Sequence, residues 1–190
     1  MISYAQGRVA QHILLLRGIN IGSRNRVAMP ELRQLLAAAG FDDVRTYLQS
    51  GNVVLASTLK PDEVVRTVKR LVAKELGLEI AVVVRSRAQL AQVVKRNPLQ
   101  KVAKDPKRYQ VSFLSAKPTA AVVRRVEEAA VPPEQVVAIG REIYAWHPDT
   151  IARSRLWALL AGQTLGVTAT ARNWTTVEKL LELADAPAPS

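Results

Sequence analysis

The sequence predicts an α+β protein built from two ferredoxin-like βαββαβ halves, each with an antiparallel sheet and helices packed on it. The first observation behind this prediction is that strand-like and helix-like apolar patterns follow one another in the order βαββαβ up to about residue 85. The second is that a βαββα order recurs after residue 108, with a glycine-centred hairpin after the first helix of each half. We therefore expect a structural duplication in which residue similarity between the halves is slight.

The first half is expected over residues 12–85. Its first strand is a short, continuous apolar run that Gly18 ends, which is typical of a buried strand. Its two helices are predicted from the recurrence of leucine and valine on one helical face, with proline at the start and glycine at the end. The predicted elements are a strand at 12–17, a helix at 30–40, paired strands at 44–48 and 52–56, a helix at 61–77 and a strand at 79–85.

The second half is expected over residues 109–183, after a basic connector at 86–108 that begins as a helix. The predicted elements are a strand at 109–114, a helix capped by Thr119, strands at 136–139 and 142–146, a helix around 156–160, a closing strand at 168–170, and a final helix capped by Asn173 or Thr175. The remaining residues, 184–190, end in alternating Ala and Pro, so we expect a disordered tail.

Composition excludes several classes of protein. The 190 residues are 48% hydrophobic, which suits a globular chain, and no run of about 18 apolar residues predicts a membrane span. The chain contains no cysteine, which excludes disulfides, zinc thiolates and thiol nucleophiles. We expect a cytoplasmic protein, a monomer or a homodimer, and we predict neither a metal nor a cofactor.

The positive charge is concentrated in one segment. The formal net charge is +11, and residues 85–108 carry eight Lys and Arg against one Asp. Such a segment could contact nucleic acid through the phosphate backbone, or it could be a solvated basic helix. Base stacking is not expected, because the strands at 12–17 and 52–56 carry no aromatic residue. The residues considered for nucleic-acid contact are Arg85, Arg87, Lys95, Arg96, Lys101, Lys104, Lys107 and Arg108.

Three motifs give the chain a family resemblance. They are residues 15–22 (Leu-Leu-Arg-Gly-Ile-Asn-Ile-Gly), 46–54 (Thr-Tyr-Leu-Gln-Ser-Gly-Asn-Val-Val) and 170–180 (Thr-Ala-Arg-Asn-Trp-Thr-Thr-Val-Glu-Lys-Leu). In this order and spacing they resemble the domain-of-unknown-function family 1697, a bacterial group, over about residues 12–183. The resemblance implies an α+β fold of two ferredoxin-like halves. It implies no activity, because the family has no established one.

The segment after the first strand is a candidate anion site. A strand end, a glycine-containing turn and a helix start present backbone N–H groups, and arginines can add charge-assisted hydrogen bonds to a phosphate or carboxylate. The alternative is a turn that needs glycine and asparagine only for its own conformation. With the polar groups of the other two motifs, the candidate anion-binding residues are Arg17, Asn20, Gly22, Arg24, Asn25, Arg26, Gln49, Ser50, Asn52, Arg172, Asn173 and Thr175.

The spatial relation of the three motifs is a separate prediction. We expect the hairpin at 49–52 and the turn after Arg17 to lie at opposite ends of the first sheet, which argues against a pocket shared by these two. Residues 172–176 repeat the pairing of arginine with asparagine at a helix start, with a structural N-cap as the alternative. A site between Arg17 and Arg172 is therefore a hypothesis that the sequence raises.

Conventional catalysis has little support in the sequence. His12 and His147 stand alone, with neither a second histidine nor a carboxylate at a spacing that indicates a metal site. Ser50 has no recognisable histidine base, so a catalytic triad is not predicted. An enzyme that uses only Arg, Asn, Ser and Thr as hydrogen-bond donors is compatible with the sequence. An interaction module that pairs through a sheet edge is a further alternative.

Overall fold

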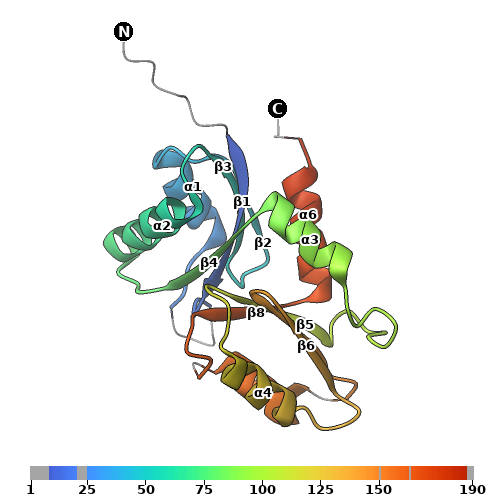
Figure 1. Cartoon of the computed structure of the whole chain (residues 1–190). Helices are drawn as coiled ribbons and strands as arrows, with labels where there is room; N and C mark the ends of the chain where they lie inside the picture. The colour runs from blue at the N-terminus through green and yellow to red at the C-terminus, as the bar shows by residue number, and fades with distance from the viewer. Residues whose placement is uncertain (1–8, 21–24, 150, 163, 188–190) are drawn as a thin grey trace. The chain divides into compact units, whose positions relative to one another are not determined.

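The structure of the chain is a computed structural model that describes residues 9–20, 25–149, 151–162 and 164–187 (Figure 1). It divides into two compact units. Unit 1 comprises Met1–Leu90 together with Leu180–Ser190, and unit 2 comprises Ala91–Lys179. Each unit contains one four-stranded antiparallel sheet with helices, so the predicted α+β fold of two βαββαβ halves is confirmed.

The first sheet has the strand order β2-β3-β1-β4, with every neighbouring pair antiparallel. Its elements and the helix that follows it are β1 (Ala10–Arg17), α1 (Met29–Ala38), β2 (Asp42–Tyr47), β3 (Asn52–Ser57), α2 (Pro61–Leu76), β4 (Ala81–Ser86) and α3 (Arg87–Arg96). The two central strands, β1 and β3, are almost wholly buried, as their continuous apolar sequence predicts.

Helices α1 and α2 cover one face of this sheet, as Figure 1 shows. Leu14 and Leu16 of β1 point to that face with Leu55 of β3, and they pack in one buried cluster with Leu32 of α1 and Val68 of α2. The helices form because valine and leucine recur on one side of each, so only that side needs to be buried.

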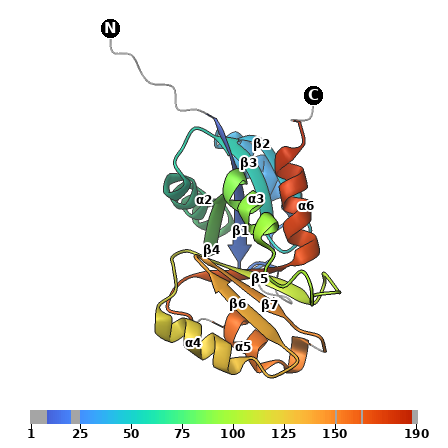
Figure 2. The same ribbon diagram turned by 45° about the vertical axis from the view of Figure 1, so that its right-hand side comes forward.

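The second sheet has the order β6-β7-β5-β8, again antiparallel throughout. Its elements are β5 (Tyr109–Leu114), α4 (Ala120–Ala129), β6 (Gln135–Ile139), β7 (Glu142–Trp146), the 3-10 turn η1 (Ile151–Arg153), α5 (Arg155–Ala161), β8 (Ala169–Asn173) and α6 (Trp174–Asp185). Figure 2 shows α4 and α5 on one face of this sheet, where Leu156 and Leu160 pack with Ile143.

The two halves match in hydrogen-bond register as well as in element order. The amide of Leu16 donates to the Gly51 carbonyl at 2.8 Å, and the amide of Leu114 donates to the Arg141 carbonyl at 2.9 Å. Both bonds join the end of the first strand to the hairpin that precedes the third strand. The duplication expected from the pattern of elements is therefore also present in the pairing of individual residues.

The matching register gives two buried arginines equivalent positions. Arg85 of β4 lies opposite Ile13, and Arg172 of β8 lies opposite Val111, the residue that corresponds to Ile13. Each guanidinium donates to the carbonyl of the preceding residue at 2.8 Å. A helix follows each strand directly, so α3 is the counterpart of α6 and each half is a βαββαβα unit.

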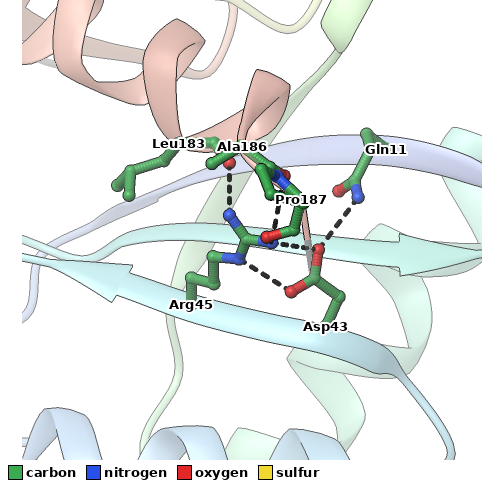
Figure 3. Close-up of polar contacts among 6 residues, drawn as sticks. All are labelled: Gln11, Asp43, Arg45, Leu183, Ala186 and Pro187. Atoms are coloured by element: carbon green, nitrogen blue, oxygen red, sulfur yellow. Dashed lines mark hydrogen bonds and ion pairs between the residues drawn. The ribbon is translucent and has the colours of Figure 1, made fainter. Parts of the chain in front are cut away.

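The C-terminal end of α6 is held by Arg45 of β2, within unit 1 (Figure 3). The Arg45 guanidinium donates to the carbonyls of Leu183, Ala186 and Pro187 at 2.6 to 3.1 Å. It also makes two bonds to the Asp43 carboxylate at 2.7 and 2.8 Å. Residues 184–187 are thus not part of a disordered tail, whereas 188–190 lie outside the described residues.

In the part of the chain that the structure describes, no helix is long and apolar enough to cross a membrane.

Candidate functional site

The β1–α1 connection and the β2–β3 hairpin meet at one end of the first sheet. Leu15 pairs with Asn52, and the Asn20 side chain donates to the Gln49 carbonyl at 2.7 Å. The prediction that the two segments lie at opposite ends of the sheet is wrong. Because β3 runs antiparallel to β1, the start of β3 lies beside the end of β1. We call this junction, formed by residues 17–20, 25–29 and 47–52, the loop–hairpin corner.

Asparagine side chains hold the corner together. The amide nitrogen of Asn20 donates to the carbonyls of Val27 and Gln49, and its amide oxygen accepts from the Val27 N–H at 2.8 Å. The Asn25 side chain donates to the Gly18 carbonyl at 2.7 Å. Both side-chain amides therefore form hydrogen bonds to the main chain. This agrees with the alternative prediction that the asparagines serve the conformation of the turn itself.

The tip of the hairpin is fixed in the same way. Asn52 is fully buried, and its side chain donates to the Tyr47 carbonyl at 2.9 Å and to the Ser50 hydroxyl at 3.0 Å. Gly51 has a φ of +75°, and a Cβ atom there would lie 2.7 Å from the Cβ of Leu16. Both the conformation and the close approach require glycine at this position.

Unusual backbone conformations gather at the corner. Positive φ angles occur at Gly18, Asn20, Asn25, Leu48 and Gly51. Leu48 is the least expected of these, because it is a leucine in a left-handed conformation and 57% of its surface is exposed. Such strain persists where the surrounding structure imposes it, and it often accompanies a functional site.

Arginines supply the charge of the corner. Arg17 ends β1 and is half-buried, and Arg26 is exposed on the connection to α1. The predicted site residues Gly22 and Arg24 lie in 21–24, outside the described residues. Residues 17–30 contain three arginines and no Asp or Glu, so the local charge favours an anion.

Comparison with known proteins assigns the family. The model of a protein family of unknown function, DUF1697, matches residues 9–144, which include the whole corner. The chain belongs to the DUF1697 family. No curated protein matches it. The resemblance drawn from the three sequence motifs is thereby confirmed, and the function of the chain remains unassigned.

One solved structure shares the fold of this chain. The structure of conserved bacterial protein SP0830 from Streptococcus pneumoniae has a TM-score of 0.76 and 22% identity, over 93% of this chain and 99% of that one. At this identity the likeness shows the fold alone. A second structure, that of the protein TA0507, covers 92% of this chain and 98% of its own, with 11% identity and a TM-score of 0.27, too low to support an argument.

The third motif of this DUF1697 chain belongs to unit 2. Arg172 lies within strand β8 and not on a loop, because β8 extends to Asn173, beyond the predicted 168–170. It is 8% exposed, it donates to the Thr170 hydroxyl at 2.7 Å, and burial lowers its pKa to about 10. Asn173 accepts from the Thr176 amide as the cap of α6, and Thr175 is exposed. The hypothesis of a site between Arg17 and Arg172 stays a prediction.

The basic residues at 85–108 are not equivalent to one another. Arg85 is 1% exposed, so it does not belong to a surface patch as predicted. Arg87 is exposed and forms a two-bond ion pair with Asp185 of unit 1. Arg108 pairs with Asp105 at 3.0 Å. The other five cations, all in unit 2, are exposed: Lys95, Arg96, Lys101, Lys104 and Lys107.

Unit 2 also has aromatic residues on its two central strands, β5 and β7. Tyr109 of β5 and Tyr144 of β7 lie on the face opposite α4 and α5, with ring centroids 6.4 Å apart. Trp174 of α6 stacks on Tyr109 at 4.8 Å, and the Tyr144 hydroxyl donates to the Val93 carbonyl of α3. Both tyrosines are buried, so this surface does not present stacking platforms for bases.

The prediction that His147 stands alone is wrong. Its Nδ1 atom lies 2.9 Å from the Glu134 carboxylate. The signal was present in the hairpin: Gln135 pairs with Trp146, so the next pair outward is Glu134 with His147. His12 is 2% exposed, and burial lowers its pKa. No group of three or more His, Cys, Asp or Glu that could hold a metal occurs among the described residues.

Proposed function

We propose that this DUF1697 protein binds a small anionic ligand, phosphorylated or carboxylated, at the loop–hairpin corner of unit 1. The proposal is carried by a comparison within the molecule. The connection from β5 to α4 in the second half takes five residues, 115–119, whereas the equivalent connection from β1 to α1 takes eleven, 18–28. The fold therefore needs only a short connection at this place, and the longer one has another reason.

The additional residues change the chemistry of the corner. The short connection carries one cation, Lys117, whereas the long one carries Arg24 and Arg26 after Arg17. Asn20 and Asn25 are engaged with the main chain, so we expect the exposed Arg26 guanidinium to be the main contact of a ligand. Guanidiniums bind phosphate and carboxylate oxygens with two parallel bonds, which gives both affinity and orientation.

A titration of the full chain followed by amide NMR tests this proposal. Inorganic phosphate, sulfate and a mononucleotide are the probes, and we expect shifts at Gly18, Gln49 and Gly51. Arg26→Gln should weaken binding about tenfold, since a hydrogen bond to a charged group contributes roughly 1.5 kcal/mol or more. Arg33→Gln, an exposed arginine on α1, is the matched control and should bind as the wild type does. Shifts confined to other regions would sink the proposal.

A second candidate is backbone-directed binding of nucleic acid by unit 2. The observation in its favour is that residues 91–108 contain six exposed cations and only one carboxylate, Asp105, which pairs with Arg108. Because the tyrosines of β5 and β7 are buried, binding would depend on phosphates and weaken steeply with salt. Fluorescence anisotropy with a labelled duplex and a labelled single strand, from 20 to 200 mM salt, tests it. Absence of binding at the lowest salt would dismiss it.

A further inference from the structure

A cavity of about 430 Å³ lies within unit 2, where the chain enters and leaves the β6–β7 hairpin. One wall is formed by residues 131–134 between α4 and β6, and the other by residues 147, 149 and 153–155. This volume falls in the range of small-molecule sites in proteins. The lining residues are Val131, Pro132, Pro133, Glu134, His147, Asp149, Arg153, Ser154 and Arg155.

Of the two carboxylates that line this cavity, Glu134 and Asp149, the first is committed to its neighbours. Glu134 accepts from the Val131 amide at 3.1 Å and lies 2.9 Å from Nδ1 of His147. Burial alone would raise the pKa of Glu134, but hydrogen bonds from Ser154, His147 and Val131 outweigh it and hold the pKa below its usual value. Glu134 is therefore an ionised acceptor whose role is to hold other groups of the wall in place.

His147 is oriented by that carboxylate. Because an ionised carboxylate can only accept, Nδ1 of His147 carries a proton and points it at Glu134. The histidine is 1% exposed, and its Nε2 atom is buried with no hydrogen-bond partner among the described residues. A buried polar atom without a partner is rare in native proteins. With the proton on Nδ1, Nε2 can only accept a hydrogen bond, so it calls for a donor and not for a carboxylate, and the histidine belongs to the site as part of its wall.

The exposed charged residues of the cavity lining are two arginines and one carboxylate, Asp149, so cations outnumber it. Arg153 and Arg155 are exposed, and within the described part of the chain neither is paired with a carboxylate. The opposite wall is apolar and is formed by Val131 with the two prolines that follow it. An anionic group beside an apolar body is the chemistry that complements this lining.

We propose that this cavity is a second binding site of the protein, for a small organic carboxylate with an apolar body. Arg153 and Arg155 hold the carboxylate, and the apolar body lies against Val131, Pro132 and Pro133. The hydrogen-bonded pair of Glu134 and His147 forms the polar part of the wall. This site shares no residue with the loop–hairpin corner, because every residue of it belongs to unit 2.

Benzoate is a suitable probe of this site, since it joins a carboxylate to a rigid apolar ring. Added to the full chain, it should shift the amides of Glu134, Arg153 and Arg155, with a dissociation constant on the order of 1 mM, as expected for so small a ligand. Benzyl alcohol and benzylamine keep the ring and lack the carboxylate, so they should bind at least tenfold more weakly. Equal binding of benzyl alcohol would overturn the assignment to a carboxylate.

Charge-removing variants locate the contact. Arg153→Gln and Arg155→Gln should each weaken benzoate binding about tenfold, and Arg124→Gln is the matched control on α4, because Arg124 is exposed but does not line the cavity. The amides of Gly18 and Gly51 serve as an internal reference for the other site. Shifts at those two amides alone, or equal effects of the Arg124 and Arg153 variants, would refute this second site while leaving the corner proposal to its own test.

Discussion

At the scale of single residues, Gly51 is a position of the corner where both the backbone conformation and the packing require glycine. Its positive φ disfavours any residue with a side chain, and a Cβ atom would lie 2.7 Å from Leu16 and 2.8 Å from the end of Ile19. The isoleucine end can move, but the Cβ of Leu16 is fixed to the strand. The corner therefore has no room for even one methyl group.

We predict that Gly51→Ala lowers the free energy of unfolding by roughly 2–4 kcal/mol, as the sum of the conformational and the overpacking effects. Gly40→Ala is the control, because Gly40 has a φ of +87° and nothing within 4 Å of its Cβ position. This substitution should lower the free energy of unfolding by only about 1–2 kcal/mol, because only the conformational effect is present there. Urea unfolding measures both, and equal losses would show that the contact with Leu16 has no effect.

His12 should make stability depend on pH. Its pKa is lowered by burial, although the nearby main chain of Leu59 and Ser57 favours the protonated form and opposes this. The unfolded chain therefore takes up a proton first as the pH falls, so the stabilisation is complete above the ordinary histidine value of 6.5 and is lost below it. The melting temperature of the wild type should fall between pH 7.5 and pH 5.

The variant His12→Leu removes this titration and serves as the comparison. Its melting temperature should change less than that of the wild type over the same pH range. Identical pH profiles of the two proteins would show that burial does not lower the pKa of His12.

At the scale of elements, strand β2 and the end of α6 are joined by one side chain. Arg45 satisfies three carbonyls at the C-terminal end of α6 and pairs with Asp43, whose side chain is 8% exposed (Figure 3). Helix ends carry carbonyls without helical partners, and a cation there complements the helix dipole. This single contact therefore orders the chain beyond the last turn of the helix.

We expect Arg45→Met to destabilise unit 1 by about 2–3 kcal/mol, because it removes charged hydrogen bonds and leaves Asp43 without its partner. Hydrogen exchange should rise first at the C-terminal end of α6. Arg87→Met, which breaks the exposed pair with Asp185, should change stability little, since such pairs are solvated and screened. If the two variants were equal, the clamp around Arg45 would not be the contact that holds α6.

The order of helices and strands could be predicted from local sequence patterns. Helices and strands were predicted in the right order, and the errors at their ends are small, because burial of one face imposes a period on the sequence that local reading detects. The exception with a consequence is β8, which extends to Asn173 and places Arg172 inside a sheet. A charged residue such as Arg172 is expected at a loop, but it is stable inside this sheet because the Thr170 hydroxyl and a main-chain carbonyl accept hydrogen bonds from its guanidinium.

At the scale of the whole molecule, the two units do not coincide with two continuous pieces of chain. Residues 180–190 belong to unit 1, although the rest of α6 belongs to unit 2. Leu180 and Ala184 are buried, and the carbonyls near the chain end bind Arg45. Deleting the last residues of the chain should therefore affect the sheet of unit 1.

We predict that a chain ending at Lys179 exchanges its amide hydrogens faster in β1, β2 and β3, while β5 and β7 keep their protection. Hydrogen exchange read by mass spectrometry measures both sheets in one sample. A control chain that ends at Pro187 keeps all the acceptors of Arg45 and should match the full chain. Equal loss of protection in both sheets would mean that the two units unfold together.

The sequence by itself determined the family, the duplicated α+β fold and the order of the elements, because these follow from motifs and from periodic burial. Only the tertiary structure decided which distant residues meet: Asn20 with Gln49, Glu134 with His147, and Arg45 with the end of α6. It also decided that Arg85 and Arg172 are buried. The physical reason is that strand register and hairpin geometry bring together side chains whose separation along the chain carries no local signal.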